Sequence, residues 1–183
     1  MVKGNIMVGQ SGGPTAVINA SLVGVYKAAQ DAGIDKIYGM QNGIEGLLQN
    51  RYVDLRAQIQ NEMDVEILKR TPAAFLGSCR YKLPDMRKEP EVYQRLFEIL
   101  ERADVRYVVY IGGNDSMDTV LKLSSYAAMV GSDIRFMGVP KTIDNDLAET
   151  DHTPGFGSAA KFVASAMKEI IRDSSVYHMD SVT

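Results

Sequence analysis

The sequence predicts an α/β fold: an open, mostly parallel β-sheet with helices on both faces, in a Rossmann-like three-layer arrangement. Strand-like and helix-like segments alternate along the chain, which is typical of β-α-β units with a parallel sheet. One strand-like segment, VRYVVYIGG (residues 105–113), is almost entirely apolar. Such a strand is expected to be buried on both faces of a parallel sheet.

The first half of the chain begins with a strand over residues 5–9 and a helix over residues 11–33. Pro14 suits the first turn of that helix and Gly33 suits its end. A second strand follows over residues 34–40. Residues 41–90 are less regular, and we expect only a short helix at VEILKR (65–70) and an extended segment at AAFLGS (73–78).

The second half shows sharper periodicity. Apolar residues recur at helical spacing in PEVYQRLFEILERAD, before the apolar strand. The remaining elements are expected to be a helix over 115–131, a strand over 134–140, a loop over 141–157 and a helix over 158–173. A further strand begins in SSVYHMDSVT (174–183), so we expect the sequence to be the front part of a longer protein.

Composition narrows the class of protein. The 183 residues are 45% hydrophobic and 23% charged, with a net charge of −3, which suits one soluble domain. Basic residues are scattered, which argues against a nucleic-acid partner. Cys79 is the only cysteine, so an intrachain disulfide and a cysteine-cluster zinc site are excluded. The longest apolar run, YVVYI, is too short for a membrane span, and no signal peptide is recognisable, so we expect a cytoplasmic protein.

Three loops at strand ends carry glycines, carboxylates or both, where open α/β sheets bind ligands. In GQSGGPT (9–15), Gly12 and Gly13 allow the backbone to approach a phosphate at the start of a helix. The spacing does not fit a dinucleotide-binding G-x-G-x-x-G motif. The alternative is that the glycines only form a tight turn.

The second loop, YIGGNDSMDT (110–119), pairs glycines with acidic residues. The backbone at Gly113 suits a phosphate, whereas Asn114 and Asp115 crowd or repel one. Asp115 has a structural alternative, which is to cap the following helix.

The third loop, PKTIDND (140–146), combines a cation with two carboxylates. Asp144 can accept a proton from a hydroxyl group while Lys141 neutralises charge on a transferring phosphoryl group. The alternative is a solvated turn in which Asp144 or Asp146 is a helix cap.

FLGSCRYK (75–82) adds Arg80 and Lys82 after an expected strand end. The guanidinium group of an arginine can bond two phosphate oxygens at once, although a single loop arginine is more often solvated. Cys79 is interpreted as a small packing residue, and His152 and His178 are given no site role.

Five motifs carry a resemblance to the phosphofructokinase family: SGGPTAVINA, FLGSCR, IGGNDS, PKTIDND and TPGFGSA occur in its order and approximate spacing. The resemblance covers essentially the whole chain. It implies that the strand-end loops gather a phosphoryl donor, Mg²⁺ and fructose 6-phosphate, and that the sugar 1-hydroxyl attacks the terminal phosphoryl group of the donor.

The resemblance also implies roles for individual residues. Asp144 is the expected base, assisted by Lys141 and Asp115, and the sugar contacts are Thr142, Ile143 and Asp144. The donor phosphates are expected at Gly12, Gly13, Arg80, Gly113 and Lys141, and the metal at Asn114 and Asp146. Asn114 stands where the family usually has an aspartate, and a neutral amide oxygen is a weaker magnesium ligand.

Two positions bear on the donor. ATP-using members resemble GGDGS and PGTIDND, with glycine where this chain has Asp115 and Lys141, and the present pair resembles the pyrophosphate-dependent branch. An Asp115 side chain would fill the space of the ATP α-phosphate. Like charges at ~4 Å and an effective dielectric near 20 repel by roughly 4 kcal/mol.

The resemblance leaves the family's MGR segment and second half-domain outside the sequence. We therefore expect residues 1–183 to be the N-terminal donor-binding part, truncated before the sugar-phosphate-binding second half and inactive alone. The full-length enzyme is expected to be a homo-oligomer. Two alternatives stay open: an ATP-dependent 6-phosphofructokinase, and a non-catalytic regulatory or binding module of the same fold.

Overall fold

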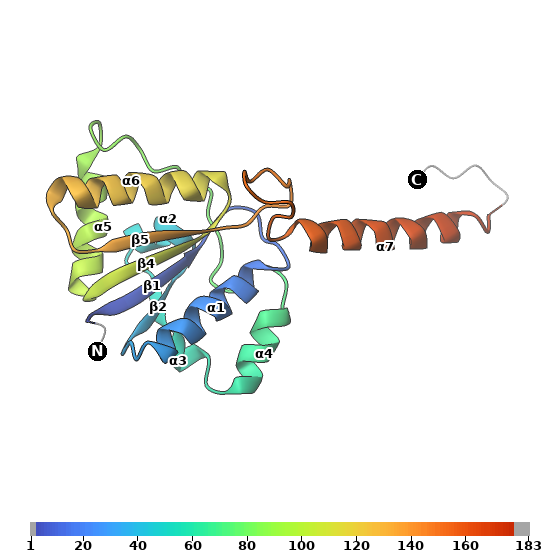
Figure 1. Cartoon of the computed structure of the whole chain (residues 1–183), viewed down its shortest axis with the longest axis horizontal. Coiled ribbons are helices and arrows are strands. Elements are labelled where there is room, and N and C mark those ends of the chain that lie inside the picture. Colours follow the sequence, from blue (N-terminus) through green and yellow to red (C-terminus); the bar gives the residue numbers. More distant parts are fainter. Residues whose placement is uncertain (1–2, 178–183) are drawn as a thin grey trace.

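The structure is a computed structural model that describes residues 3–177 (Figure 1). Its strands are β1 (Asn5–Gln10), β2 (Ile37–Met40), β3 (Tyr52–Asp54), β4 (Val105–Gly112) and β5 (Arg135–Pro140). Its helices are α1 (Ile18–Asp31), α2 (Gly43–Leu48), α3 (Leu55–Gln58), α4 (Glu62–Arg70), α5 (Pro90–Arg102), α6 (Asn114–Val130) and α7 (Phe156–Ser174). The predicted alternation of strands and helices is confirmed.

The strands form one sheet in the order β3-β2-β1-β4-β5. β1 pairs in parallel with β2 and β4, and β4 pairs in parallel with β5, whereas β3 is antiparallel to β2. The register aligns Gln10 with Ile111 and Gly112 with Pro140. The carboxyl ends of β1, β4 and β5 therefore lie side by side, and the loops that follow them meet at one edge.

Two apolar cores cover the two faces of the sheet. On β1, Ile6 and Val8 face one core with α1, α3 and α4, and Met7 faces the other with α2, α5 and α6. Alternation along a strand sends successive side chains to opposite faces. The structure is thus a three-layer α/β/α domain, as predicted.

Several local expectations were wrong. The first helix begins at Ile18, so Pro14 lies in the preceding loop and not in the first helical turn. Residues 73–78 form a turn closed by a 3.0 Å hydrogen bond from the Gly77 N–H to the Ala74 carbonyl oxygen, and are not extended. Three short elements, α2, β3 and α3, were not predicted, because three to six residues leave little periodicity to detect.

Helix α7 differs from the other helices. It projects away from the sheet (Figure 1), and none of its residues is buried. Large apolar side chains such as Phe162, Val163 and Ile171 are more than half exposed. The strand expected within 174–183 lies outside the described residues from His178 onward. Over residues 3–177, the helices lack the combination of length and apolar character that a membrane span requires.

Candidate functional site

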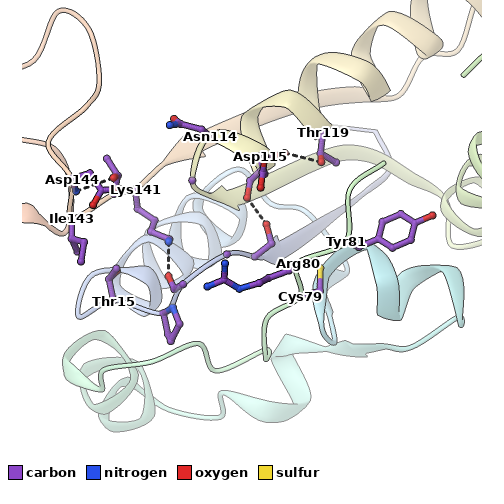
Figure 2. A pocket seen from close by; sticks show the side chains of 17 residues that line it. Thr15, Cys79, Arg80, Tyr81, Asn114, Asp115, Thr119, Lys141, Ile143 and Asp144 are labelled. Carbon is purple, nitrogen blue, oxygen red and sulfur yellow. Dashed lines mark hydrogen bonds between the residues drawn. The ribbon is translucent and has the colours of Figure 1, made fainter. Parts of the chain in front are cut away.

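The predicted strand-end loops meet around one cavity of about 440 Å³ (Figure 2). It lies beyond the carboxyl ends of β1, β4 and β5. The predicted site residues that line it are Gly12, Gly13, Arg80, Gly113, Asn114, Asp115, Lys141, Thr142, Ile143 and Asp144. Asp146 lies outside this lining and reaches the site through Asn114. The structure therefore brings together residues as far apart in sequence as Gly12 and Asp144.

The first loop approaches the neighbouring loops closely. Gly12 has a φ of +79°, a conformation that favours glycine. A Cβ atom there would lie 3.5 Å from the Lys141 Nζ atom. The Gly12 N–H donates to the Cys79 carbonyl oxygen at 3.1 Å. Gly12 therefore allows the first loop to lie close to Lys141 and Cys79, and its N–H already has a partner within the protein.

Lys141 is a buried cation at the floor of the cavity. Only 5% of the residue is exposed, and its ammonium group donates a hydrogen bond to the Gly13 carbonyl oxygen. Burial lowers the pKa of Lys141 below 10.5, the nearby Arg80 lowers it further, and Asp144 partly opposes these effects. Figure 2 shows Lys141 and Arg80 extending into the same cavity. Because burial and the neighbouring Arg80 destabilise the charge of Lys141, an anion bound beside it would be stabilising.

The second loop begins helix α6 at the cavity. A Cβ atom on Gly112 would lie 2.0 Å from the Ser116 Oγ atom, so only glycine fits there. Gly113 is the N-cap residue and has no side-chain capping bond. The alternative in which Asp115 caps the helix is therefore wrong, because Asp115 lies in the first helical turn. Its side chain is 77% exposed and lies 3.6 Å from the Lys82 Nζ atom.

The third loop is anchored at its base and exposed beyond it. The Lys141 N–H donates to the Gly112 carbonyl oxygen at 2.9 Å, which holds the loop on β4. Thr142 is buried, and its hydroxyl oxygen accepts a 3.0 Å hydrogen bond from the Asp144 N–H. Asp144 itself is exposed. The N-cap of α7 is Gly155, so neither Asp144 nor Asp146 caps that helix.

Asn114 and Asp146 are joined across the two loops. The Asn114 Nδ2 atom donates to the Asp146 Oδ2 atom at 2.9 Å. This hydrogen bond, followed by one from Thr142, lowers the pKa of Asp146 below 3.8. The carboxylate therefore stays ionised at neutral pH. Across residues 3–177, no group of three or more histidine, cysteine or acidic side chains is arranged to hold a metal ion.

Cys79 occupies a packing position. The residue is buried, and its thiol lies 3.7 Å from the Tyr110 hydroxyl group. Burial raises the pKa of Tyr110 well above 10, so the hydroxyl stays neutral. This arrangement agrees with the prediction that Cys79 packs.

Sequence reasoning missed several residues that line the cavity: Ser11, Thr15, Tyr81, Ser116 and Thr119. The hydroxyl oxygens of Ser11 and Ser116 are hydrogen-bonded to each other across the two glycine loops. The Thr15 hydroxyl oxygen is buried without a partner. Ser11, Thr15 and Ser116 lie within three residues of paired glycines, which was the available signal. A hydroxyl residue near a glycine is nevertheless common in ordinary turns.

Comparison with known proteins places this geometry in a family. A family profile described as Phosphofructokinase matches residues 5–182. The pyrophosphate--fructose 6-phosphate 1-phosphotransferase of Xanthomonas campestris pv. campestris (strain B100) is 46% identical over 173 residues, which are 94% of this chain and 41% of that protein. The ATP-dependent 6-phosphofructokinase of Glaesserella parasuis serovar 5 (strain SH0165) is 35% identical over 179 residues, covering 97% of this chain and 50% of that protein.

A solved structure agrees with these relatives. The pyrophosphate-dependent phosphofructokinase of Nitrosospira multiformis superposes with a TM-score of 0.83 at 42% identity, over 93% of this chain and 42% of that one. The chain thus spans about 41% of the length of the pyrophosphate-named relative from Xanthomonas. With a family match along nearly its whole length, this chain belongs to the phosphofructokinase family.

Proposed function

We propose that residues 1–183 are the N-terminal donor-binding part of an enzyme that transfers a phosphoryl group from pyrophosphate to the 1-hydroxyl of fructose 6-phosphate, giving fructose 1,6-bisphosphate. The observation that carries this proposal is the buried Lys141 ammonium beside Arg80. The relatives named for pyrophosphate are 40% to 46% identical, against 35% for those named for ATP, which supports the choice of donor.

The donor phosphates bind between the first two loops and the base of the third. Lys141 supplies a fixed positive charge, and Arg80 supplies a planar group that bonds two oxygens. Gly12 and Gly13 leave room for the phosphate against the backbone, while Gly113 is the N-cap of α6, whose N-terminus favours negative charge. As the phosphoryl group leaves, charge develops on the remaining phosphate, and Lys141 stabilises it.

The acceptor binds at the exposed rim of the cavity. The Asp144 carboxylate accepts the proton of the sugar 1-hydroxyl as that oxygen attacks the terminal phosphorus atom. The hydrogen bond from the Asp144 N–H to the Thr142 hydroxyl oxygen fixes the backbone that carries this carboxylate. Thr142 and Ile143 contact the sugar beside the base.

The residues at the site fit a magnesium ion that is held mainly through its substrate. Mg²⁺ prefers oxygen ligands and commonly uses one or two carboxylates together with substrate phosphates. The ionised Asp146 carboxylate provides one such ligand, and the Asn114 amide oxygen stays available because its Nδ2 atom makes the bond to Asp146. When bound, magnesium supplies positive charge that offsets the charge of the donor phosphates.

The exclusion of ATP by Asp115 is weaker than the sequence suggested. The side chain is 77% exposed, and the ammonium group of Lys82 lies 3.6 Å away. In a water-like dielectric, two like charges at 4 Å repel by about 1 kcal/mol, which is roughly fivefold in affinity. We therefore propose that the larger share of the donor preference comes from Lys141, whose buried charge matches a short two-phosphate donor.

A comparison of donors tests the proposal. The intact gene product is assayed for fructose 1,6-bisphosphate formation with Mg-pyrophosphate and with Mg-ATP at matched concentrations. We expect a clear preference for pyrophosphate, and an ATP preference would establish the alternative donor. We further propose that the 183-residue chain alone gives no turnover, which the same assay can check. We also propose that the intact enzyme is cytoplasmic and a homo-oligomer. Size-exclusion chromatography with light scattering can check its oligomeric state.

A further inference from the structure

Two buried polar side chains lie behind the cavity and take no part in the chemistry proposed above. Gln10 is fully buried at the end of β1, and Asn19 is 1% exposed in the first turn of α1. Burying an amide side chain is unfavourable unless its hydrogen-bonding groups have partners. Their partners therefore indicate what these residues hold in place.

The two amides bond to each other and to a distant segment of backbone. The Gln10 Nε2 atom donates to the Asn19 Oδ1 atom at 3.0 Å, and the Gln10 Oε1 atom accepts from the Leu76 N–H at 2.9 Å. The Asn19 Oδ1 atom accepts from the Phe75 N–H at 2.8 Å, and its Nδ2 atom donates to the Thr71 carbonyl oxygen at 3.0 Å. Both ends of each amide are thus satisfied.

The segment they hold, residues 71–80, contains neither helix nor strand. Its backbone therefore lacks the regular hydrogen bonds of a helix or a sheet. Its position depends instead on hydrogen bonds to side chains outside the segment. Gln10 and Asn19 fix its first part. Further along, the Ser78 hydroxyl group donates to the Gly12 carbonyl oxygen, and the Gly12 N–H donates to the Cys79 carbonyl oxygen. The residue after Cys79 is Arg80, which extends into the cavity (Figure 2).

We propose that Gln10 and Asn19 are positioning residues that set the place of Arg80 for the donor phosphates. This inference rests on the proposed function, because it assigns Arg80 to the donor. An arginine that bonds two phosphate oxygens at once requires a narrow range of positions and angles. The amide pair is suited to this task because each residue offers a donor and an acceptor, which a methionine or leucine of similar size lacks.

The test uses the intact gene product and the variant Gln10→Met, which keeps the volume and removes the hydrogen bonds. The control is Tyr26→Phe, which removes a buried hydrogen bond from α1 to the Ile59 carbonyl oxygen, away from the cavity. The readouts are the KM for pyrophosphate, kcat, Tm and hydrogen exchange at the Phe75 and Leu76 amides. We expect Gln10→Met to raise the KM for pyrophosphate about tenfold, the size expected when a charged hydrogen bond is misplaced. Tyr26→Phe should lower Tm without this change.

A double-mutant cycle with Arg80→Ala shows whether the effect passes through Arg80. We expect Gln10→Met to change the KM by less than about twofold once Arg80 is absent, because coupled residues are not additive. Equal losses in both backgrounds would overturn the inference. If Gln10→Met does not fold, Asn19→Ser replaces it, since its hydroxyl is too short to reach the Phe75 N–H.

Failure of the inference can be told apart from failure of the proposed function. If the unaltered gene product does not use pyrophosphate, the proposed function is wrong. In that case the assignment of Arg80 to the donor falls as well, but the exchange measurement still shows whether Gln10 holds the segment that leads to Arg80. Faster exchange at Phe75 and Leu76 in Gln10→Met supports the positioning role, and unchanged protection contradicts it.

Discussion

The two sides of the cavity are built differently. The donor wall, which we define as residues 11–13, 78–80 and 141, is backed by buried residues and crossed by hydrogen bonds between loops. The rim loop, residues 143–152, is almost wholly exposed. The Thr153 hydroxyl group closes its base by donating to the Thr142 carbonyl oxygen at 2.9 Å. Beyond the base, the Asn145 Nδ2 atom donates to the Asp151 carbonyl oxygen at 3.1 Å, and Asp146 accepts from Asn114.

We propose that this difference separates donor binding from the chemical step. A buried cation such as Lys141, held in place by its hydrogen bond to Gly13, can bind and stabilise phosphate charge with little rearrangement. An exposed carboxylate such as Asp144 can act only on a substrate that is held beside it. Holding the two reacting groups together lowers the barrier of the reaction. The chain spans 41% of a relative named for pyrophosphate, and it carries a buried cation, Lys141, together with an exposed carboxylate, Asp144. The comparison therefore predicts that changes at the two sides affect different kinetic constants.

The largest expected effect comes from a substitution in the rim loop. In the intact gene product, Asp144→Asn should lower kcat by about 10²–10⁴-fold, because it removes the proton acceptor. The KM for pyrophosphate should change little, since the donor wall stays intact. Glu149→Gln is the matched control, because it makes the same change of charge in the same exposed loop. An unchanged kcat in Asp144→Asn would favour the non-catalytic alternative.

On the donor wall, Lys141→Met should lower kcat/KM for pyrophosphate by about 10²–10³-fold, the cost of losing one preorganised charge-stabilising donor. Lys168→Met, an exposed lysine of α7, serves as the control. Steady-state kinetics at varied pyrophosphate measures both variants. If Lys141→Met and Lys168→Met behaved alike, the donor wall would not bind the donor.

A smaller effect is expected from the exposed Asp115 side chain. Asp115→Gly should tighten ATP binding by roughly fivefold, because its charge is well solvated and lies near Lys82. Adding Lys141→Gly should improve ATP use relative to pyrophosphate further. Inhibition of the pyrophosphate reaction by ATP measures the affinity in each variant. Flat ATP affinity in the double variant would show that neither side chain selects the donor.

The smallest effect concerns the bond that joins the two loops. Asn114→Ala should raise the pKa of Asp146 toward 3.8, because the amide donor that lowers it is removed. A carboxylate with a lowered folded-state pKa adds stability above its unfolded pKa and loses it as the pH falls through the folded value. Carboxyl titration by NMR measures the shift. A pKa of Asp146 that did not move would show that Asn114 does not bond to it in solution.

The parts of the structure with a regular sequence pattern could be predicted from the sequence. The parallel sheet followed from apolar strands such as 105–113, and the cavity followed from loops at strand ends. Sequence reasoning missed the short elements between residues 41 and 58 and the turn at 73–78, which hydrogen bonds from distant residues fix. The proximity of Lys82 to Asp115 could not be predicted either, because the two residues are more than 30 positions apart in sequence.

We propose above all that the buried Lys141 and its neighbour Arg80 bind a two-phosphate donor. A crystal structure of the intact gene product with Mg-pyrophosphate tests it most directly. We expect phosphate oxygens within hydrogen-bonding distance of the Lys141 ammonium and the Arg80 guanidinium groups, against the glycine loop at Gly12. Pyrophosphate bound elsewhere, with both cations out of its reach, would contradict the claim.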